Sequence, residues 1–144
     1  MTTSSPLPKN TTRQLSDADY ETLASFRHAL RRFIVFSEAV AVTEGLATQQ
    51  HQALLAIKGL ARSPSVGELA ERLMIRHHSA VELVGRLVRM GLVSRLPDPT
   101  DRRRVRVSLT PLAEQKLAGL SAAHLEELRA IRPLLVSLLD RFDD

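Results

Sequence analysis

Arginine is concentrated between residues 72 and 106, where nine arginines stand against the three acids Glu82, Asp98 and Asp101. This segment carries a net +6 while the whole chain carries +4, so its basicity is a local patch. Guanidinium groups are planar, permanently charged donors that pair with phosphate oxygens and with the O6 and N7 atoms of guanine. The patch therefore predicts a polyanionic partner, and double-stranded DNA is the one that we expect.

Residues 78–90 have the spacing of an amphipathic helix that would present part of this patch. Its apolar positions recur at i, i+3, i+4, i+7 and i+8, and Gly91 follows where a C-terminal cap belongs. The core face comprises Ala80, Leu83, Val84, Leu87 and Val88. The candidate DNA contacts lie on the opposite face and at the helix start: His77, His78, Ser79, Glu82, Arg86 and Arg89.

These candidates have the chemistry that reading a major groove requires. We expect Arg86 to form a forked pair with guanine and Ser79 to bond a base or a phosphate. The histidines lie at the helix N-terminus, where partial positive charge favours a phosphate. Two roles stay open for Glu82, which either accepts from cytosine N4 or orients Arg86. Arg89 either reaches a phosphate or makes no contact.

A second, shorter helix precedes this one. Ser65 and Glu68 form the S-x-x-E pattern of a capping box, and the apolar residues that follow have helical spacing. About three residues, Met74 to Arg76, separate the two helices. Two helices joined by such a short turn are typical of a helix-turn-helix motif.

Beyond Gly91 the hydrophobic period changes to two, which predicts a β-hairpin with strands at 92–96 and 104–109. One face of the second strand is apolar and should pack, while the face with Arg104, Arg106 and Ser108 should be solvated. Three adjacent arginines lie at the tip, where they would reach a flanking minor groove: Arg102, Arg103 and Arg104.

Long helices are predicted on both sides of this central part. Ser16 and Asp19 form a capping box for a first helix that ends near Gly45, and Thr48 is expected to cap the next helix. Thr110 with Pro111 starts a last helix, which Pro133 should bend or break. We expect a flexible N-terminal arm (1–15), a helical dimerisation region (16–46 and 111–144) and a DNA-binding lobe (47–110).

From about Gln49 to Leu117 the chain resembles the MarR family of winged-helix regulators. The motifs that carry the resemblance are Glu68-Leu69-Ala70, Gly91-Leu92-Val93 with Arg95, and Asp98-Pro99-Thr100-Asp101-Arg102-Arg103-Arg104 before Leu109-Thr110. The resemblance implies a winged helix-turn-helix fold, and a homodimer that binds pseudo-palindromic operators as a repressor relieved by a small aromatic or phenolic ligand. It also implies that Asp101 supports the wing through a salt bridge to Arg103; Arg95 is a second candidate for wing support.

Composition excludes several other classes of protein. The chain has no cysteine, so disulfides and thiolate chemistry are ruled out. Neither a membrane span nor a secretory signal is predicted, and we expect a cytoplasmic protein. No cofactor, metal or enzymatic activity is expected: adjacent histidines on a helix diverge, and no nucleophile has a plausible base.

Two alternatives stay open. The basic patch would serve a winged-helix protein-interaction module if its partner were an acidic protein, although no Phe, Tyr or Trp lies between Thr48 and Leu128 to form a protein hot spot. Phe33 and Phe36 are expected in the dimer core, and the alternative is that they line an effector pocket.

Overall fold

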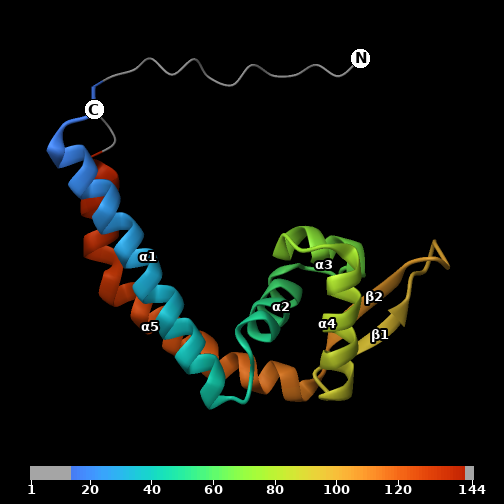
Figure 1. Ribbon diagram of the computed structural model, residues 1–144. Coiled ribbons are helices and arrows are strands. Elements are labelled where there is room, and N and C mark those ends of the chain that lie inside the picture. Colours follow the sequence, from blue (N-terminus) through green and yellow to red (C-terminus); the bar gives the residue numbers. More distant parts are fainter. Residues whose placement is uncertain (1–13, 142–144) are drawn as a thin grey trace, which may run out of the picture.

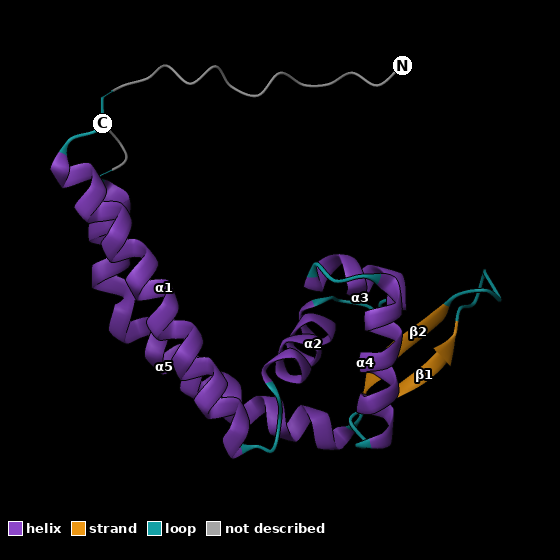
Figure 2. Ribbon diagram, in the orientation of Figure 1, coloured by secondary structure: helices purple, strands orange, loops and turns teal. Residues whose placement is uncertain are grey.

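The computed structural model describes residues 14–141 (Figures 1 and 2). This part of the chain is mainly helical with one two-stranded antiparallel sheet, which confirms the expected fold class. Residues 1–13, which hold most of the predicted N-terminal arm, and 142–144 lie outside the described residues. In chain order the elements are α1 (Asp17–Thr43), α2 (Thr48–Gly59), α3 (Val66–Leu73), α4 (His77–Arg89), β1 (Val93–Pro97), β2 (Val105–Leu109) and α5 (Pro111–Asp140).

The molecule consists of an arm and a lobe (Figure 1). In the arm, α1 and most of α5 run side by side; in the lobe, α2, α3, α4 and the hairpin pack together. The first turns of α5 belong to the lobe as well, because Ala113, Leu117 and Leu120 are buried in its core. A single helix therefore connects the lobe core to the far end of the arm.

The local signals at the helix ends are largely confirmed. Asp19 N–H donates to Ser16 Oγ (3.2 Å) and Ser16 N–H donates to Asp19 Oδ2 (2.9 Å), which is the predicted capping box. At the start of α3 only half of the predicted box forms: Glu68 N–H donates to Ser65 Oγ (3.1 Å), while the Glu68 carboxylate accepts from the Arg62 side chain (3.0 Å). Thr110 caps α5, with Pro111 in its first turn. Gly45 and Gly91 adopt the positive φ angles that end α1 and α4.

One predicted helix boundary is wrong, and at another the structure excludes one of two alternatives. Thr48 does not cap α2, because Ala47 is the N-cap and its backbone N–H donates to the Gln50 side chain at 2.9 Å. Pro133 does not break α5, which continues to Asp140. The turn beyond Pro133 is held against α1 by buried Leu138 and by the Arg141 guanidinium, which donates to Thr22 Oγ1 at 3.1 Å.

The hairpin is fixed to the start of α3. Its strands pair in register, with Val93 opposite Leu109 and Pro97 opposite Val105. Val107 is fully buried, and its N–H donates to the Pro64 carbonyl at 2.9 Å. Because β2 thus contacts both β1 and the segment before α3, the base of the wing is a fixed part of the lobe.

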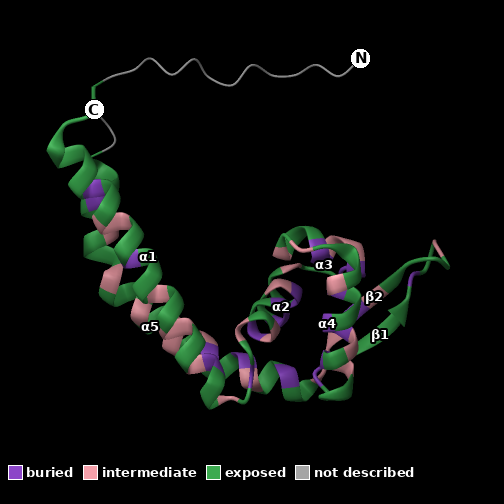
Figure 3. Ribbon diagram, in the orientation of Figure 1, coloured by how far each residue is buried: buried purple, intermediate pink, exposed green. Residues whose placement is uncertain are grey.

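Most of the arm is exposed (Figure 3), and many of its exposed side chains are apolar. The exposed fractions reach 71% at Val42 and 65% at Val35. No helix in residues 14–141 is both long and apolar enough to span a membrane. The exposed apolar side chains of the arm are Tyr20, Leu23, Leu30, Ile34, Val35 and Val42 on α1, and Leu125, Leu128, Leu134, Val136 and Leu139 on α5.

Candidate nucleic-acid interface

Helix α4 presents the predicted polar face to solvent. The core face is buried as expected, apart from the half-buried Val88. On the opposite face His78, Glu82, Arg86 and Arg89 are exposed, and Ser79 is half-buried. Glu82 and Arg86 form no ion pair within the described part of the chain, so both side chains are available to a partner.

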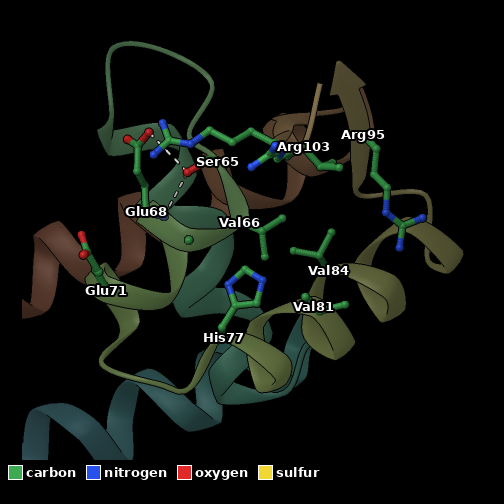
Figure 4. A pocket seen from close by; sticks show the side chains of 12 residues that line it. Ser65, Val66, Glu68, Glu71, His77, Val81, Val84, Arg95 and Arg103 are labelled. Atoms are coloured by element: carbon green, nitrogen blue, oxygen red, sulfur yellow. Dashed lines mark hydrogen bonds between the residues drawn. The ribbon is translucent and has the colours of Figure 1, made fainter. Parts of the chain in front are cut away.

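His77 lies apart from this face. Its side chain points into a groove of about 410 Å³ between α3, α4 and the wing, which Val81, Arg95 and Arg103 also line (Figure 4). The acids Glu68 and Glu71 lie on the α3 side of the groove, where Glu68 is paired with Arg62 at 2.6 Å. Three residues that the sequence analysis singled out, His77, Arg95 and Arg103, therefore line one groove.

The three arginines of the wing tip, Arg102, Arg103 and Arg104, are all exposed. Asp101 contacts the tip differently from the implied salt bridge: its Oδ1 accepts from the backbone N–H of Arg103 at 2.9 Å. None of the ion pairs among residues 14–141 joins the two side chains. Asp101 thus shapes the backbone of the turn and leaves the Arg103 guanidinium unpaired.

The strongest support of the wing comes from Asp98 and Arg106. The Asp98 side chain is almost completely buried, and its Oδ1 accepts from Thr100 N–H (2.9 Å), Thr100 Oγ1 (3.0 Å) and Asp101 N–H (3.0 Å). Its Oδ2 accepts from Arg106 Nε at 2.9 Å. The backbone N–H groups of Thr100 and Asp101, assisted by the Thr100 hydroxyl and Arg106, hold the pKa of Asp98 well below its usual range.

The prediction that the Arg106 face of β2 is solvated is wrong at Arg106 itself. Its guanidinium is half-buried and donates from Nη1 to the Ser63 carbonyl at 2.8 Å while it holds Asp98. Sequence reasoning missed both residues as wing supports. The strand pattern assigned Arg106 to a face, but no local signal relates it to Ser63, which lies 43 residues earlier in the chain.

Arg95 has no bracing contact in the described structure. Its side chain leaves β1 and runs toward α4 (Figure 4), and the described residues give it no hydrogen bond or ion pair. Within residues 14–141 there is also no group of three or more His, Asp or Glu side chains that would hold a metal ion.

A second hollow lies where the arm meets α2. Its volume is about 430 Å³, and its lining is mostly apolar, with Phe33, Leu55 and Leu128 beside His51 and His124. The Leu120 carbonyl lies 2.6 Å from His124 Nδ1 and only accepts, so Nδ1 carries the proton; in the neutral ring Nε2 then accepts from Ser37 Oγ at 2.7 Å.

His51 is the unusual group of this hollow. It is 3% exposed, its ring centroid lies 4.9 Å from that of His124, and its Nδ1 is buried without a hydrogen-bond partner. Burial, and secondarily the neighbouring His124, lower the pKa of His51 below its ordinary value, so the ring is neutral near pH 7.

Together, α2, α3, α4 and the hairpin define a winged helix-turn-helix protein. Comparisons with known proteins agree. The sequence model of the MarR family matches residues 44–104. The transcriptional activatory protein BadR of Rhodopseudomonas palustris is 42% identical over 69 residues, which cover 46% of this chain and 39% of BadR.

Solved structures extend the match to the arm. AbsC, a MarR-family transcriptional regulator from Streptomyces coelicolor, has a TM-score of 0.73 at 20% identity, with 90% of this chain and 92% of AbsC covered. MarR from E. coli in its apo form has a TM-score of 0.65 at 23% identity, with 83% and 93% covered. Over residues 44–104 the chain is similar to the MarR family, as the resemblance of its motifs predicted, and solved MarR-family structures share its fold along the arm as well.

Proposed function

We propose that this protein is a non-enzymatic, sequence-specific, double-stranded-DNA-binding transcription regulator. The observation that carries the proposal is the placement of two unpaired cationic features on one lobe: the outward face of α4 and the exposed arginines of the wing tip. A helix of this kind fits one major groove, and the wing would reach the next minor groove. The match of residues 44–104 to the MarR family model and the similarity to BadR, which is named a transcriptional activatory protein, support it.

A homodimer is the form in which the protein would act. The apolar side chains exposed along the arm are more numerous than a soluble monomer usually leaves in contact with water, and a second arm would cover them. Two identical recognition helices read two equivalent half-sites, so the operator should be pseudo-palindromic. The half-site centres should lie about 10–10.5 base pairs, or one helical turn, apart.

The hollow between the arm and α2 is the site that we propose for a small effector. Its apolar walls suit an aromatic ring, and His51, whose Nδ1 has no hydrogen-bond partner among the described residues, would bind a phenolic hydroxyl. Because α5 runs from the arm into the lobe core, a ligand that shifts α1 against α5 would also shift the lobes. If the ligand weakens DNA binding, DNA must weaken ligand binding by the same factor.

Repression relieved by that ligand is the regulatory effect that we propose. Its direction depends on where the operator lies, because a dimer over the promoter blocks polymerase while one upstream can recruit it. The name of BadR makes activation the alternative outcome. Mapping the operator relative to the transcription start, with and without the protein, separates the two.

Selection of genomic fragments with the purified full chain tests the proposal. We expect recovered fragments to share an inverted repeat with the spacing given above. Recovery of fragments with no common motif would contradict sequence-specific binding. If, in addition, an acidic peptide bound to the lobe and the duplex did not compete with it, the basic surface would belong to a protein-interaction module.

A further inference from the structure

Two arginines from different elements converge on one point of α4. A Cβ atom placed on Gly85 would lie 3.5 Å from Nη1 of Arg89 and 3.6 Å from Nη2 of Arg95. Arg89 comes from the last turn of the same helix, and Arg95 reaches across from β1. Both guanidinium groups therefore lie beside the bare backbone of Gly85, with these two nitrogen atoms no more than about 7 Å apart.

No acid among residues 14–141 compensates this pair of like charges. None of the described ion pairs includes either arginine, and both side chains are exposed. Two cations held close together repel each other, and a shared anion between them removes that cost. The flat guanidinium fork matches the oxygens of a phosphate, which both arginines would contact at once.

The position of this pair is informative about which phosphate it would take. Val81 and Gly85 are one helical turn apart on the flank of α4 that faces the wing, and Val81 lines the groove of Figure 4. A duplex that offers its major groove to α4 and the adjacent minor groove to the wing tip must pass one sugar–phosphate backbone between them. That backbone crosses this groove.

We propose that Arg89 and Arg95 form a clamp for one DNA backbone phosphate per half-site, with Gly85 as its floor. The clamp rests on the proposed DNA-binding function and adds a third contact region to the recognition face and the wing tip. It assigns Arg95 to DNA and not to support of the wing. Gly85 suits the position because a Cβ there would already be in van der Waals contact with both guanidinium groups, so a longer side chain would compete with a phosphate for the space beside them.

A methylphosphonate scan of the selected duplex tests the clamp. Each phosphate is replaced in turn by a neutral methylphosphonate, and binding is measured for the wild-type protein and for Arg89→Gln/Arg95→Gln. We expect one position per half-site at which the methylphosphonate lowers the affinity of the wild type about tenfold or more. At that position the double variant should bind the modified and the unmodified duplex equally well. Because both side chains act on one phosphate, the loss of binding free energy in the double variant should be smaller than the sum of the losses in the two single variants.

The salt dependence gives a second readout. The slope of log K against log salt should fall by about 0.9 for each phosphate that the protein no longer neutralises, so the double variant should show that decrease once per half-site. Arg129→Gln on α5 is the matched control, because it removes an exposed arginine of the arm without touching α4. Its slope should equal that of the wild type.

Gly85→Gln tests the floor while both charges stay in place. Glutamine is a better helix former than glycine, so the variant should fold at least as well as the wild type. We expect it to bind the duplex more weakly and to show no single-phosphate footprint.

The clamp is refuted if the wild type binds the duplex with a salt-dependent affinity that both the Arg89/Arg95 double variant and Gly85→Gln retain. The clamp is also refuted if the wild type binds inorganic phosphate saturably in the absence of DNA, the double variant does not, and the methylphosphonate scan is the same for both proteins. Arg89 and Arg95 would then form a site for a free anion. Failure of the wild type to bind any selected duplex would instead refute the proposed function.

Discussion

Arg106 and Asp98 are joined across the base of the wing, with Nε of the arginine 2.9 Å from Oδ2 of the carboxylate. The same guanidinium donates to the Ser63 carbonyl just before α3. The turn that carries the tip arginines is therefore anchored to the helix-turn-helix core through one side chain. The wing is held in place by this buried pair, and the arginines at its tip are left free to contact a partner.

Asp98→Asn should release the wing without unfolding the lobe. The amide still accepts from the turn backbone, but it lacks the charge that holds Arg106. We expect a lower Tm, faster amide hydrogen exchange at residues 98–104 and weaker DNA binding with unchanged base preference. Thr100→Val is the milder control, because it removes only the hydroxyl contact to Asp98. Its Tm, exchange rates and DNA affinity should lie between those of the wild type and Asp98→Asn.

The Asp98 contribution should depend on pH in a defined direction. Its folded pKa lies below the ordinary value of 3.8, so the unfolded chain takes up a proton first as the pH falls. The stabilisation is complete above that value and is lost as the pH falls through the folded pKa. Thermal unfolding curves of wild type and Asp98→Asn should therefore converge at low pH; a constant difference would show that the charge of Asp98 is not what stabilises the wing.

His51 predicts a second pH dependence at a higher pH. Because burial lowers its folded pKa, the unfolded state binds more protons below the ordinary value of 6.5, and stability falls as the pH drops. His51→Gln should flatten the dependence of stability on pH as the pH falls through the ordinary histidine value of 6.5, as measured by chemical denaturation. The control variant His28→Gln, at an exposed position of α1, should show the same slope of stability against pH as the wild type. Equal slopes in all three proteins would contradict a neutral, buried His51.

The arm should mediate dimerisation through its exposed apolar side chains. Leu134→Glu would place a carboxylate in the interface, at a cost of about 3 kcal/mol or more, which weakens association roughly 100-fold. Sedimentation velocity should show dimers for the wild type at micromolar concentration and a large monomer fraction for the variant. Met74→Glu alters an apolar side chain that is 91% exposed on the lobe and should remain dimeric. A monomeric wild type would refute the role of the arm.

Arg86 and Arg103 should affect DNA binding in different ways. Arg86→Ala removes a proposed forked base contact and should cost about 1–3 kcal/mol on the preferred sequence only, which relaxes specificity. Arg103→Ala removes a proposed minor-groove contact and should weaken binding more evenly and reduce the salt slope by about 1. Competition titrations with single-base variants of the operator distinguish the two patterns. An Arg103→Ala variant with unchanged affinity and slope would show that the wing does not touch DNA.

The elements that sequence predicted well are those fixed by neighbouring residues. The Ser65–Glu68 cap, the buried face of α4 and the turn at Gly91 follow from side chains three or four positions apart, and the structure confirms them. The exposed positions of Arg86 and the tip arginines follow from the same periodicities.

The features that the sequence did not predict depend on contacts between residues far apart in the chain. An alternating strand pattern gives the face of Arg106 but not the carbonyl of Ser63 that receives its guanidinium. The general rule that proline ends a helix failed at Pro133, since packing of α5 against α1 on both sides keeps the helix continuous. The convergence of Arg89 and Arg95 over Gly85 likewise needs the tertiary placement of β1 beside α4.

We propose that the outward face of α4 and the wing tip together read a DNA sequence. An anisotropy titration of the wild-type protein with the selected duplex and with a scrambled duplex of the same composition, at several salt concentrations, tests this directly. We predict at least about 1,000-fold tighter binding to the selected duplex, with affinity falling steeply as salt rises. Equal affinities for the two duplexes, or none for either, would contradict the account.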